Sequence, residues 1–354
     1  MPPATPLAFA QGSLLLLCLV SCSARLDLGH DRTGDGGQTA PESRTAALCA
    51  GTPCFAGPVV ELATSSGSAR GLALDQNTLF WTASAAQALM ATPKDGTPTT
   101  KIVAPPGEPA FVALDDENVY FTGGLGGYVA AVAKDLPKSL VPKAPKISLL
   151  ASGEPNPQSI VVTSEGVYYA DQAAGTINRV SLDGSLVETL VTGIASGCDL
   201  SLDAQFLYYS DSGLGELHAL DRQTGLSELL LSGLRHPMAP LPHGAALYFL
   251  ELGTEAASYA DGRLLRMQRG ASTVEVLLTN LDAPRALAAD SSAVYLGTRG
   301  TAPNHLQGRI VRLADDGQVS TLATAQAEPF AVAVDDAAVY WTADAANGLY
   351  AISR

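Results

Sequence analysis

Charged residues are scarce in this chain of 354 residues, and basic residues are the scarcest: 16% are charged, with 21 Lys and Arg against 35 Asp and Glu. The formal net charge of -14 repels nucleic-acid phosphates, which excludes a DNA- or RNA-binding protein. Low charge together with 34 Gly and 22 Pro is typical of many short strands joined by tight turns. The composition therefore favours an all-β fold over long solvated helices.

Motifs of several enzyme classes are also missing. The chain contains no Gly-x-Ser-x-Gly elbow, no His-Glu-x-x-His, no Gly-rich phosphate loop and no Cys-x-x-Cys pair. Its apolar stretch from Ser13 to Ser21 is too short to cross a bilayer, which needs about 20 apolar residues. We therefore predict no catalytic residue from motifs, and we interpret the apolar stretch as the core of a signal peptide.

The segment Leu19-Val20-Ser21-Cys22 follows that apolar stretch and resembles the lipobox of bacterial lipoproteins. The resemblance implies that residues 1–21 are a lipoprotein signal peptide and that Cys22 becomes the acylated N-terminus. Ser23 would then favour transfer to the outer membrane, because an Asp at that position usually signals retention. We expect an exported protein held at the cell envelope by its lipid. The alternative is an ordinary secretory signal cleaved nearby.

Residues 22–56 are expected to connect this anchor to a folded domain. They are rich in Gly, Ser, Thr and charge and show no periodicity, so they predict a disordered tether. Cys49 and Cys54 enclose four residues that include a Gly and a Pro, a spacing that a small disulfide loop can close in an oxidising compartment. Cys198 is left unpaired and is expected to be a buried core thiol.

The rest of the chain contains seven copies of one pattern, an apolar strand, a turn and then an aromatic pair. The second position of the pair falls at Trp81, Phe121, Tyr169, Tyr209, Phe249, Leu296 and Trp341, with spacings of 40, 48, 40, 40, 47 and 45 residues. Each copy holds four strand-like segments, which is the arithmetic of a β-propeller blade. The turn after the first strand carries Asp75, Asp115, Thr163, Asp203, His243, Asp290 or Asp335, which can bond the backbone two residues on.

Closure of the ring can also be predicted. The last copy ends after its third strand at residues 348–354, while Val59-Val60-Glu61-Leu62-Ala63 precedes the first copy and matches the fourth-strand pattern. We therefore predict a seven-bladed β-propeller over residues 57–354 whose N-terminal strand completes the last blade and removes an exposed edge.

The aromatic units resemble those of known propeller families. Segments such as Phe80-Trp81-Thr82, Tyr168-Tyr169-Ala170-Asp171 and Tyr340-Trp341-Thr342 are similar to the Tyr-Trp-Thr-Asp repeats of lipoprotein-receptor propellers and to the NHL and TolB-like propellers. The resemblance implies the fold and carries little about function, because propellers host binding modules and enzymes alike. A six-bladed TolB-like ring is the alternative.

In a propeller, ligands usually meet the mouth of the central channel where the first strands begin. Aligning the repeats places two rings of residues there, and the chemically interesting members are Arg70, Glu108, Asn156, His236, Arg285 and Glu328. Glu108, Asn156, His236 and Glu328 are the candidate metal ligands, since oxygen ligands with an imidazole suit calcium or zinc. This set is similar in residue type to the calcium site of gluconolactonase-like propellers. Arg70 and Arg285 could neutralise these carboxylates or hold a small anion.

Two functions follow from these observations. The first is a non-enzymatic propeller that binds an envelope protein, peptide or glycan while its lipid anchors it to the membrane, with no cofactor expected. The alternative is a metal-dependent hydrolase or lactonase of the gluconolactonase-like type that acts at the channel mouth with calcium.

Overall fold

The computed structural model describes residues 48–49, 52–53, 58–103, 107–134, 145–271, 273–302 and 304–354. Seven antiparallel sheets of four strands contain most of these residues, and the one helical element among them is the short 3₁₀ helix η1 (Glu255–Ala257). Two further strands, β1 (Leu48–Cys49) and β2 (Thr52–Pro53), form a separate antiparallel pair. Within the described ranges, no helix is long and apolar enough to cross a bilayer.

Six sheets are built from four consecutive strands each. Blade 1 comprises β4 (Ala69–Leu74), β5 (Thr78–Ala83), β6 (Ala88–Pro93) and β7 (Thr100–Val103). Blade 2 comprises β8 (Pro109–Leu114), β9 (Asn118–Gly123), β10 (Tyr128–Ala133) and β11 (Ile147–Ser152). Blade 3 comprises β12 (Pro157–Thr163), β13 (Gly166–Asp171), β14 (Thr176–Val180) and β15 (Val187–Thr192).

Blades 4 to 6 continue the same order. Blade 4 comprises β16 (Leu200–Leu202), β17 (Phe206–Asp211), β18 (Glu216–Asp221) and β19 (Ser227–Leu231). Blade 5 comprises β20 (Pro237–His243), β21 (Ala246–Glu251), β22 (Gly262–Gln268) and β23 (Val274–Leu281). Blade 6 comprises β24 (Pro284–Asp290), β25 (Ala293–Thr298), β26 (Gly308–Ala314) and β27 (Val319–Gln326).

Blade 7 joins the two ends of the ring. It contains β28 (Pro329–Val334), β29 (Ala338–Ala343) and β30 (Gly348–Ser353), and its fourth strand is the N-terminal β3 (Val60–Thr64). In the antiparallel pairing of β3 with β30, Val60 lies opposite Ala351 and Thr64 opposite Gly348. The predicted seven blades and the predicted N-terminal closure are both confirmed, and the six-bladed alternative is excluded.

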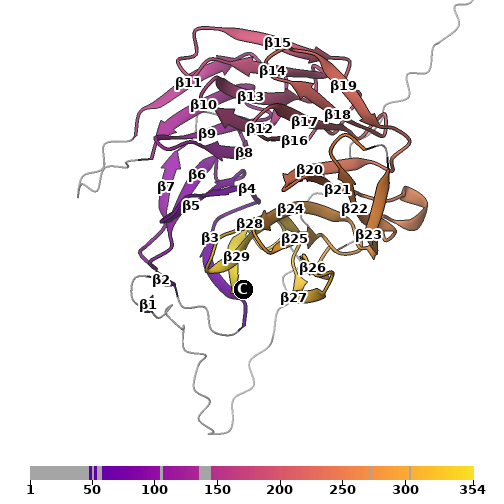
Figure 1. Cartoon of the computed structure of the whole chain (residues 1–354). Coiled ribbons are helices and arrows are strands. Elements are labelled where there is room, and N and C mark those ends of the chain that lie inside the picture. Colours follow the sequence, from indigo (N-terminus) through magenta and orange to yellow (C-terminus); the bar gives the residue numbers. More distant parts are fainter. Residues whose placement is uncertain are drawn as a thin grey trace, which may run out of the picture. The chain divides into compact units, whose positions relative to one another are not determined.

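The first strands of the blades surround the axis of the ring, and the fourth strands lie at the rim (Figure 1). Each first strand contacts the first strands of the two neighbouring blades, from β4 through β8, β12, β16, β20 and β24 to β28 and back to β4. The second strands are sandwiched between neighbouring sheets, and β13, β21, β25 and β29 are buried along their whole length. This explains why the second strands have continuous apolar sequences where a half-exposed strand would alternate.

Hydrophobic clusters fill the spaces between adjacent blades. One cluster combines Phe80 and Leu89 of blade 1 with Phe121 and Tyr128 of blade 2, and the other interfaces repeat this arrangement. Trp81 and Trp341 are fully buried, with 0% exposure each. The prediction that the repeated aromatic residues form the core is confirmed.

The hydroxyl that follows the aromatic pair bonds one blade to the next. Thr82 Oγ1 donates to the carbonyl oxygen of Ala110 at 2.8 Å, and Thr122 Oγ1 donates to that of Gln158 at 2.9 Å. Thr342 Oγ1 donates to the carbonyl oxygen of Arg70 at 2.5 Å, across the closure of the ring. In a buried interface such a bond satisfies a carbonyl that would otherwise lose its water partner. These three threonines therefore stabilise three successive interfaces, from blade 7 to blade 3.

The hairpin between the first and second strands is held by an aspartate in five blades. Asp75 Oδ1, for example, accepts the backbone N–H groups of Asn77 and Thr78 at 2.9 Å each. Asp115, Asp203, Asp290 and Asp335 make the same pair of bonds in their own hairpins. The predicted turn function of these residues is confirmed.

A cation from the following blade pairs with the hairpin acid at five of the seven interfaces. It is always the first residue after a third strand, or the last residue of the chain in blade 7. Lys94 Nζ lies 2.6 Å from Asp335 Oδ2, and Lys134 Nζ lies 3.3 Å from Asp75 Oδ2. The remaining pairs are Arg222 with Glu165, Arg269 with Asp203 and Arg354 with Asp290. A circle of ion pairs thus links neighbouring blades on the hairpin side.

The free energy of unfolding is expected to fall as the pH drops from about 5 towards 2. The acids concerned are the five hairpin aspartates, Asp75, Asp115, Asp203, Asp290 and Asp335. Burial acts to raise their pKa, but the backbone N–H donors and the neighbouring cations outweigh burial and hold the pKa of each below its ordinary value. An unfolded aspartate titrates near 3.9, so the stabilisation is fully present above that pKa and is lost as protons bind the folded carboxylates.

Urea unfolding between pH 7 and pH 3 measures this dependence. The Asp335→Asn variant serves as its control, because it removes one depressed carboxyl while the amide keeps the size of the side chain. We expect the variant to be less stable at pH 7 and to lose less stability on acidification. An unfolding free energy that stays constant down to pH 3 would contradict the assignment.

Candidate binding site at the channel mouth

The connection into each first strand lies beside the turn between the second and third strands. In six blades, a carbonyl oxygen shortly before the first strand accepts a hydrogen bond from the residue after the second strand, as in Gln172 N to Asn156 O at 3.0 Å and Asp344 N to Glu328 O at 3.0 Å. The residues that accept in this way are Ser68, Asn156, Ser196, His236, Ala283 and Glu328. They therefore occupy equivalent positions at one end of the channel, as the repeat alignment placed them.

Acidic side chains fix this end of the ring in blades 3 to 5. Asp171, Asp211 and Glu251 end the second strands and are buried. Their carboxylates accept backbone N–H groups of the entering chain, from Asn156 at 3.2 Å, Ala195 at 2.8 Å and Arg235 at 3.1 Å. The fourth position of the aromatic repeat thus shapes the mouth in the three blades where it is acidic.

Glu328 is engaged by a neighbouring arginine. Arg299 Nε donates to Glu328 Oε1 at 2.9 Å, and a second guanidinium nitrogen contacts the same oxygen. The backbone of Glu328 is left-handed, with φ of 58°, and its N–H donates to the carbonyl oxygen of His305 at 2.8 Å. The carboxylate is therefore part of an ion pair between the turn that follows β25 in blade 6 and the connection from blade 6 to blade 7.

The other candidate metal ligands have separate surroundings. The Asn156 carboxamide oxygen accepts a hydrogen bond from Gln158 Nε2 at 2.6 Å. The His236 ring meets the Tyr259 ring edge-on, with 6.3 Å between centroids, and Glu108 is exposed. Among the residues that the structure describes, no group of three or more His, Cys, Asp or Glu side chains is placed to hold a metal ion. Metal binding at the mouth stays a prediction.

The structure brings Arg70 and Arg285 together on one aromatic ring. The guanidinium carbon of Arg285 lies 4.7 Å from the centroid of the Phe330 ring, and that of Arg70 lies 5.7 Å from it. Arg285 Nη1 donates to Asp199 Oδ2 at 3.3 Å, and Arg70 Nε lies 3.4 Å from Asp344 Oδ2. The two arginines therefore form one cluster, which we call the arginine cluster: Arg70, Arg285, Phe330, Asp199 and Asp344.

Both ion pairs of the arginine cluster are long for charged hydrogen bonds, which are usually 2.7–2.9 Å. Arg70 Nε is buried and makes no hydrogen bond to the described residues despite its position beside Asp344. Asp199 Oδ2 also accepts the backbone N–H of Ala239 at 3.0 Å. Cation–π attraction to Phe330 contributes to holding both guanidinium groups, each of which has five N–H donors.

Asp199, Asp344 and Arg299 were missed by the sequence interpretation. Asp199, directly before β16, is the one acidic residue at its place in the repeat, where the other repeats have Gly71, Phe111, Ser159, Ala239, Ala286 and Ala331. Arg299 and Asp344 are both the first residue after a second strand. Extending the repeat alignment by these two columns would have placed all three beside the mouth.

Cys198 lies next to this cluster in sequence and is free and buried, as predicted. Burial raises the pKa of its thiol well above the ordinary value, and the carboxylates of Asp199 and Asp211 act in the same direction. The thiol is therefore protonated at neutral pH, which fits a packing role and not a nucleophile. Cys54 lies outside the described residues, so its predicted bond to Cys49 stays a prediction, and the signal peptide, Cys22 and most of the tether also lie outside.

Comparison with solved structures supports the propeller. A streptogramin B lyase structure superimposes with a TM-score of 0.67 at 14% identity, covering 83% of this chain and 96% of that one. Virginiamycin B lyase from Staphylococcus aureus gives 0.67 at 14% identity, covering 84% and 99%. A chain of a nidogen/laminin complex gives 0.52 at 18% identity, covering 67% and 89%, in agreement with the YWTD-like repeat.

At these identities the likeness shows the fold alone. No protein-family model matches the chain, and no curated protein sequence matches it. The residues of the mouth therefore carry the functional argument.

Proposed function

We propose that this protein is an exported, lipid-anchored binding protein whose propeller recognises an acidic group of an envelope peptide or glycan at the channel mouth. The observation that carries the proposal is the arginine cluster, in which Arg70 and Arg285 both lie over Phe330. The lipobox-like segment ending in Cys22 supports export and anchoring.

Hydrogen-bond donors, and not net charge, favour an anionic group at this site, since the whole chain carries a formal charge of -14. Each arginine faces one aspartate at 3.3–3.4 Å, so the four charges cancel locally while the guanidinium edges keep donors that these long contacts leave unused. A carboxylate can take two parallel N–H bonds from a guanidinium, and such bidentate pairs are shorter and stronger than single ones. Phe330, with Phe111 6.0 Å away, supplies an apolar surface for the carbon skeleton of the ligand.

Two of the candidate metal ligands at the mouth already have polar partners. Glu328 forms an ion pair with Arg299, and the Asn156 side chain accepts a hydrogen bond from Gln158. Both side chains therefore stabilise the mouth through these contacts. A rigid ring of this kind presents a fixed set of donors without needing to close over its ligand.

Calorimetric titration with short peptides that end in a free carboxylate, and with oligosaccharides that contain uronic acids, tests the proposal. We expect the carboxylate forms to bind and the corresponding amides or neutral sugars to bind roughly tenfold more weakly, since a charged hydrogen bond contributes about 1.5–3 kcal/mol. The Arg70→Gln/Arg285→Gln double variant should lose the preference for the carboxylate.

Arg299→Gln is the matched control, because it removes an arginine of the same mouth that does not stack on Phe330. It should bind as the unmodified protein does. The titration is repeated with calcium and with a chelator, and the ligand is recovered afterwards. Cleavage of the ligand, or binding that requires calcium and is lost in Glu328→Gln, would replace this proposal by the metal-dependent hydrolase.

A further inference from the structure

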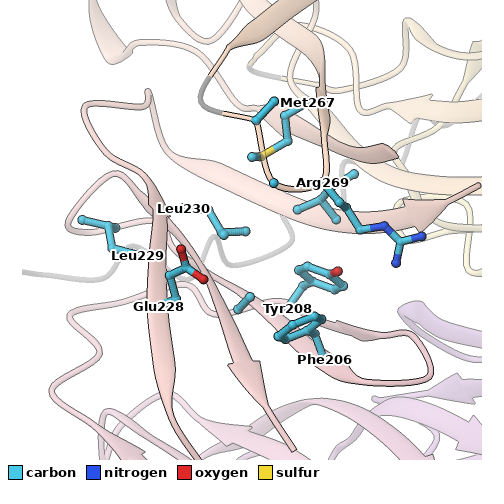
Figure 2. Close-up of a pocket in the computed structure, with 11 residues that line it drawn as sticks. Phe206, Tyr208, Glu228, Leu229, Leu230, Met267 and Arg269 are labelled. Atoms are coloured by element: carbon cyan, nitrogen blue, oxygen red, sulfur yellow. The ribbon is translucent and has the colours of Figure 1, made fainter. Parts of the chain in front are cut away.

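A cavity lies between blades 4 and 5, on the hairpin side of the ring and not at the channel mouth. It has a volume of about 480 Å³, within the range of sites for small organic molecules. Its walls are mainly apolar, with Phe206, Leu230, Leu247 and Met267 among them (Figure 2). Its polar members are Tyr208, Glu228 and Arg269. The ion pairs and the hydrophobic clusters described above do not fill this cavity.

The same position one blade further on shows why the cavity is large. The space between blades 5 and 6 is lined by the equivalent residues, with Tyr248 in place of Tyr208, Glu275 in place of Glu228 and Leu277 in place of Leu230. Its volume is about 220 Å³, less than half that of the first cavity. The wall differs in the third strand, where blade 5 has Arg266 and blade 4 has Ala219.

Arg266 occupies its cavity with a specific geometry. Its Nη2 lies 2.6 Å from Glu275 Oε2, and its guanidinium carbon lies 5.9 Å from the centroid of the Tyr248 ring. Blade 3 repeats the pair in the same register, with Arg179 Nη2 2.5 Å from Glu188 Oε2. The fold therefore builds a guanidinium site from a second-strand tyrosine and a fourth-strand glutamate in both blades that flank blade 4.

Blade 4 keeps the tyrosine and the glutamate and lacks the arginine. Ala219 lies opposite both Tyr208 and Glu228 in the sheet, which is the register of Arg179 and Arg266 in the flanking blades. Within the described part of the chain, Glu228 makes no hydrogen bond or ion pair, in contrast to Glu188 and Glu275. A tyrosine, a free carboxylate and an apolar wall thus surround the place that an arginine fills elsewhere.

We propose that this cavity binds a ligand that carries a guanidinium group on an apolar body, which supplies from outside the cation that blades 3 and 5 supply themselves. The guanidinium bonds the Glu228 carboxylate and lies against Tyr208, and the apolar part packs on Leu230, Leu247 and Met267. An arylguanidine or an arginine side chain of a peptide offers this chemistry. The site is separate from the arginine cluster and does not depend on it.

Arg269 does not oppose a cation in this cavity. Its guanidinium pairs with Asp203 and with the carbonyl oxygen of Gly244, and Figure 2 shows it directed away from Glu228. The charges of Arg269 and Asp203 cancel each other, so the carboxylate of Glu228 gives the cavity a net negative charge. Glu228 is exposed, so water screens its attraction for a cation, and contact with the apolar walls has to contribute to binding beside the ion pair.

Phenylguanidine and the peptide acetyl-Leu-Arg-Leu-amide are the two probes, titrated calorimetrically into the purified full chain. Phenylurea and the citrulline form of the peptide are their neutral analogues. We expect at least one guanidinium probe to bind, and its neutral analogue to bind at least roughly tenfold more weakly. Tighter binding of the peptide indicates an arginine of a protein partner, and tighter binding of phenylguanidine indicates a small molecule.

Three variants locate the binding. Glu228→Gln should weaken it at least roughly tenfold, and Ala219→Arg should abolish it while raising the midpoint of thermal unfolding, because the variant rebuilds the arrangement of blade 5. Glu188→Gln, which changes the same position in a blade that has its own arginine, should leave binding intact. Failure of both guanidinium probes to bind, or undiminished binding to Glu228→Gln, would overturn the proposal even if Ala219→Arg fails to fold.

Discussion

Replacing Cys22 by alanine is expected to move the protein from the membrane fraction to the soluble fraction of the cell envelope and to abolish incorporation of a labelled fatty acid. The lipobox-like Leu19-Val20-Ser21-Cys22 predicts the thiol of Cys22 as the acylated atom, and alanine has no thiol. Each buried methylene of an acyl chain contributes about 0.8 kcal/mol to membrane binding, so the effect should be close to complete. Fractionation followed by immunoblotting, with fatty-acid labelling in parallel, measures it.

Cys18→Ala is the matched control, because it removes a cysteine from the same apolar stretch while keeping the lipobox-like segment. Labelling and membrane association should both persist in this variant. If Cys22→Ala remains labelled and membrane-bound, the acylation site lies elsewhere. If the unmodified protein is soluble and unlabelled, the ordinary secretory signal is the correct interpretation.

Removing β3 is expected to destabilise the whole propeller. A chain that begins at Ser66 lacks the fourth strand of blade 7, which leaves the backbone of β30 unpaired along one side and uncovers the cluster on which Val60, Leu62 and Ala63 pack. Loss of these partly buried side chains and of the strand pairing should cost on the order of 5 kcal/mol, a large share of the 5–15 kcal/mol that stabilises a typical domain. Urea unfolding and light scattering measure the loss of stability and the association through the exposed edge.

Two further chains separate the strand from the rest of the N-terminus. A chain that begins at Gly57 keeps β3 and should unfold as the complete protein does. A chain that begins at Ser66 and carries residues 58–65 after Arg354, joined by Asn-Gly, places the strand in a hairpin with β30 and should recover the stability. Equal stability of the Ser66 chain and the Gly57 chain would show that β3 contributes little.

The propeller was predictable because each blade has the same sequence pattern, with the same kinds of residue at equivalent strand and turn positions. The aromatic pair marks the fully buried second strand, and the aspartate of the hairpin marks the turn before it, as at Asp335 before Tyr340 and Trp341. Closure was predictable for the same reason. Residues 59–63 have the pattern of a fourth strand but precede the first repeat, and the last repeat lacks a fourth strand. Periodic patterns of this kind report which residues share a sheet position.

The arrangement at the mouth could be predicted only in part. The alignment placed Arg70 and Arg285 in one ring, yet the acid that each arginine meets lies in a different column: Asp199 directly before β16, and Asp344 directly after β29. Arg299 reaches Glu328 from the turn after β25, and Asp344 reaches Arg70 from the turn after β29. Other repeats have different residues in these columns, so the repeat pattern alone did not indicate the contacts.

The cavity between blades 4 and 5 was visible in the sequence, although it was not recognised there. Ala219 stands in the column of Arg179 and Arg266, while Glu228 stands in the column of Glu188 and Glu275. A missing residue becomes informative only after the structure shows that the two columns face each other across neighbouring strands. The missing arginine then corresponds to a cavity of about 480 Å³ that contains the carboxylate of Glu228.

The completion of blade 7 by β3 also sets the order in which strands can pair as the chain emerges N-terminus first. Thr64 and its partner Gly348 are separated by 284 positions, so β3 emerges before all other strands of the propeller and the strand that it joins emerges last. During this time six blades can form from sequence-adjacent strands while β3 remains unpaired. Its short length of five residues and the charge of Glu61 limit mispairing over that interval.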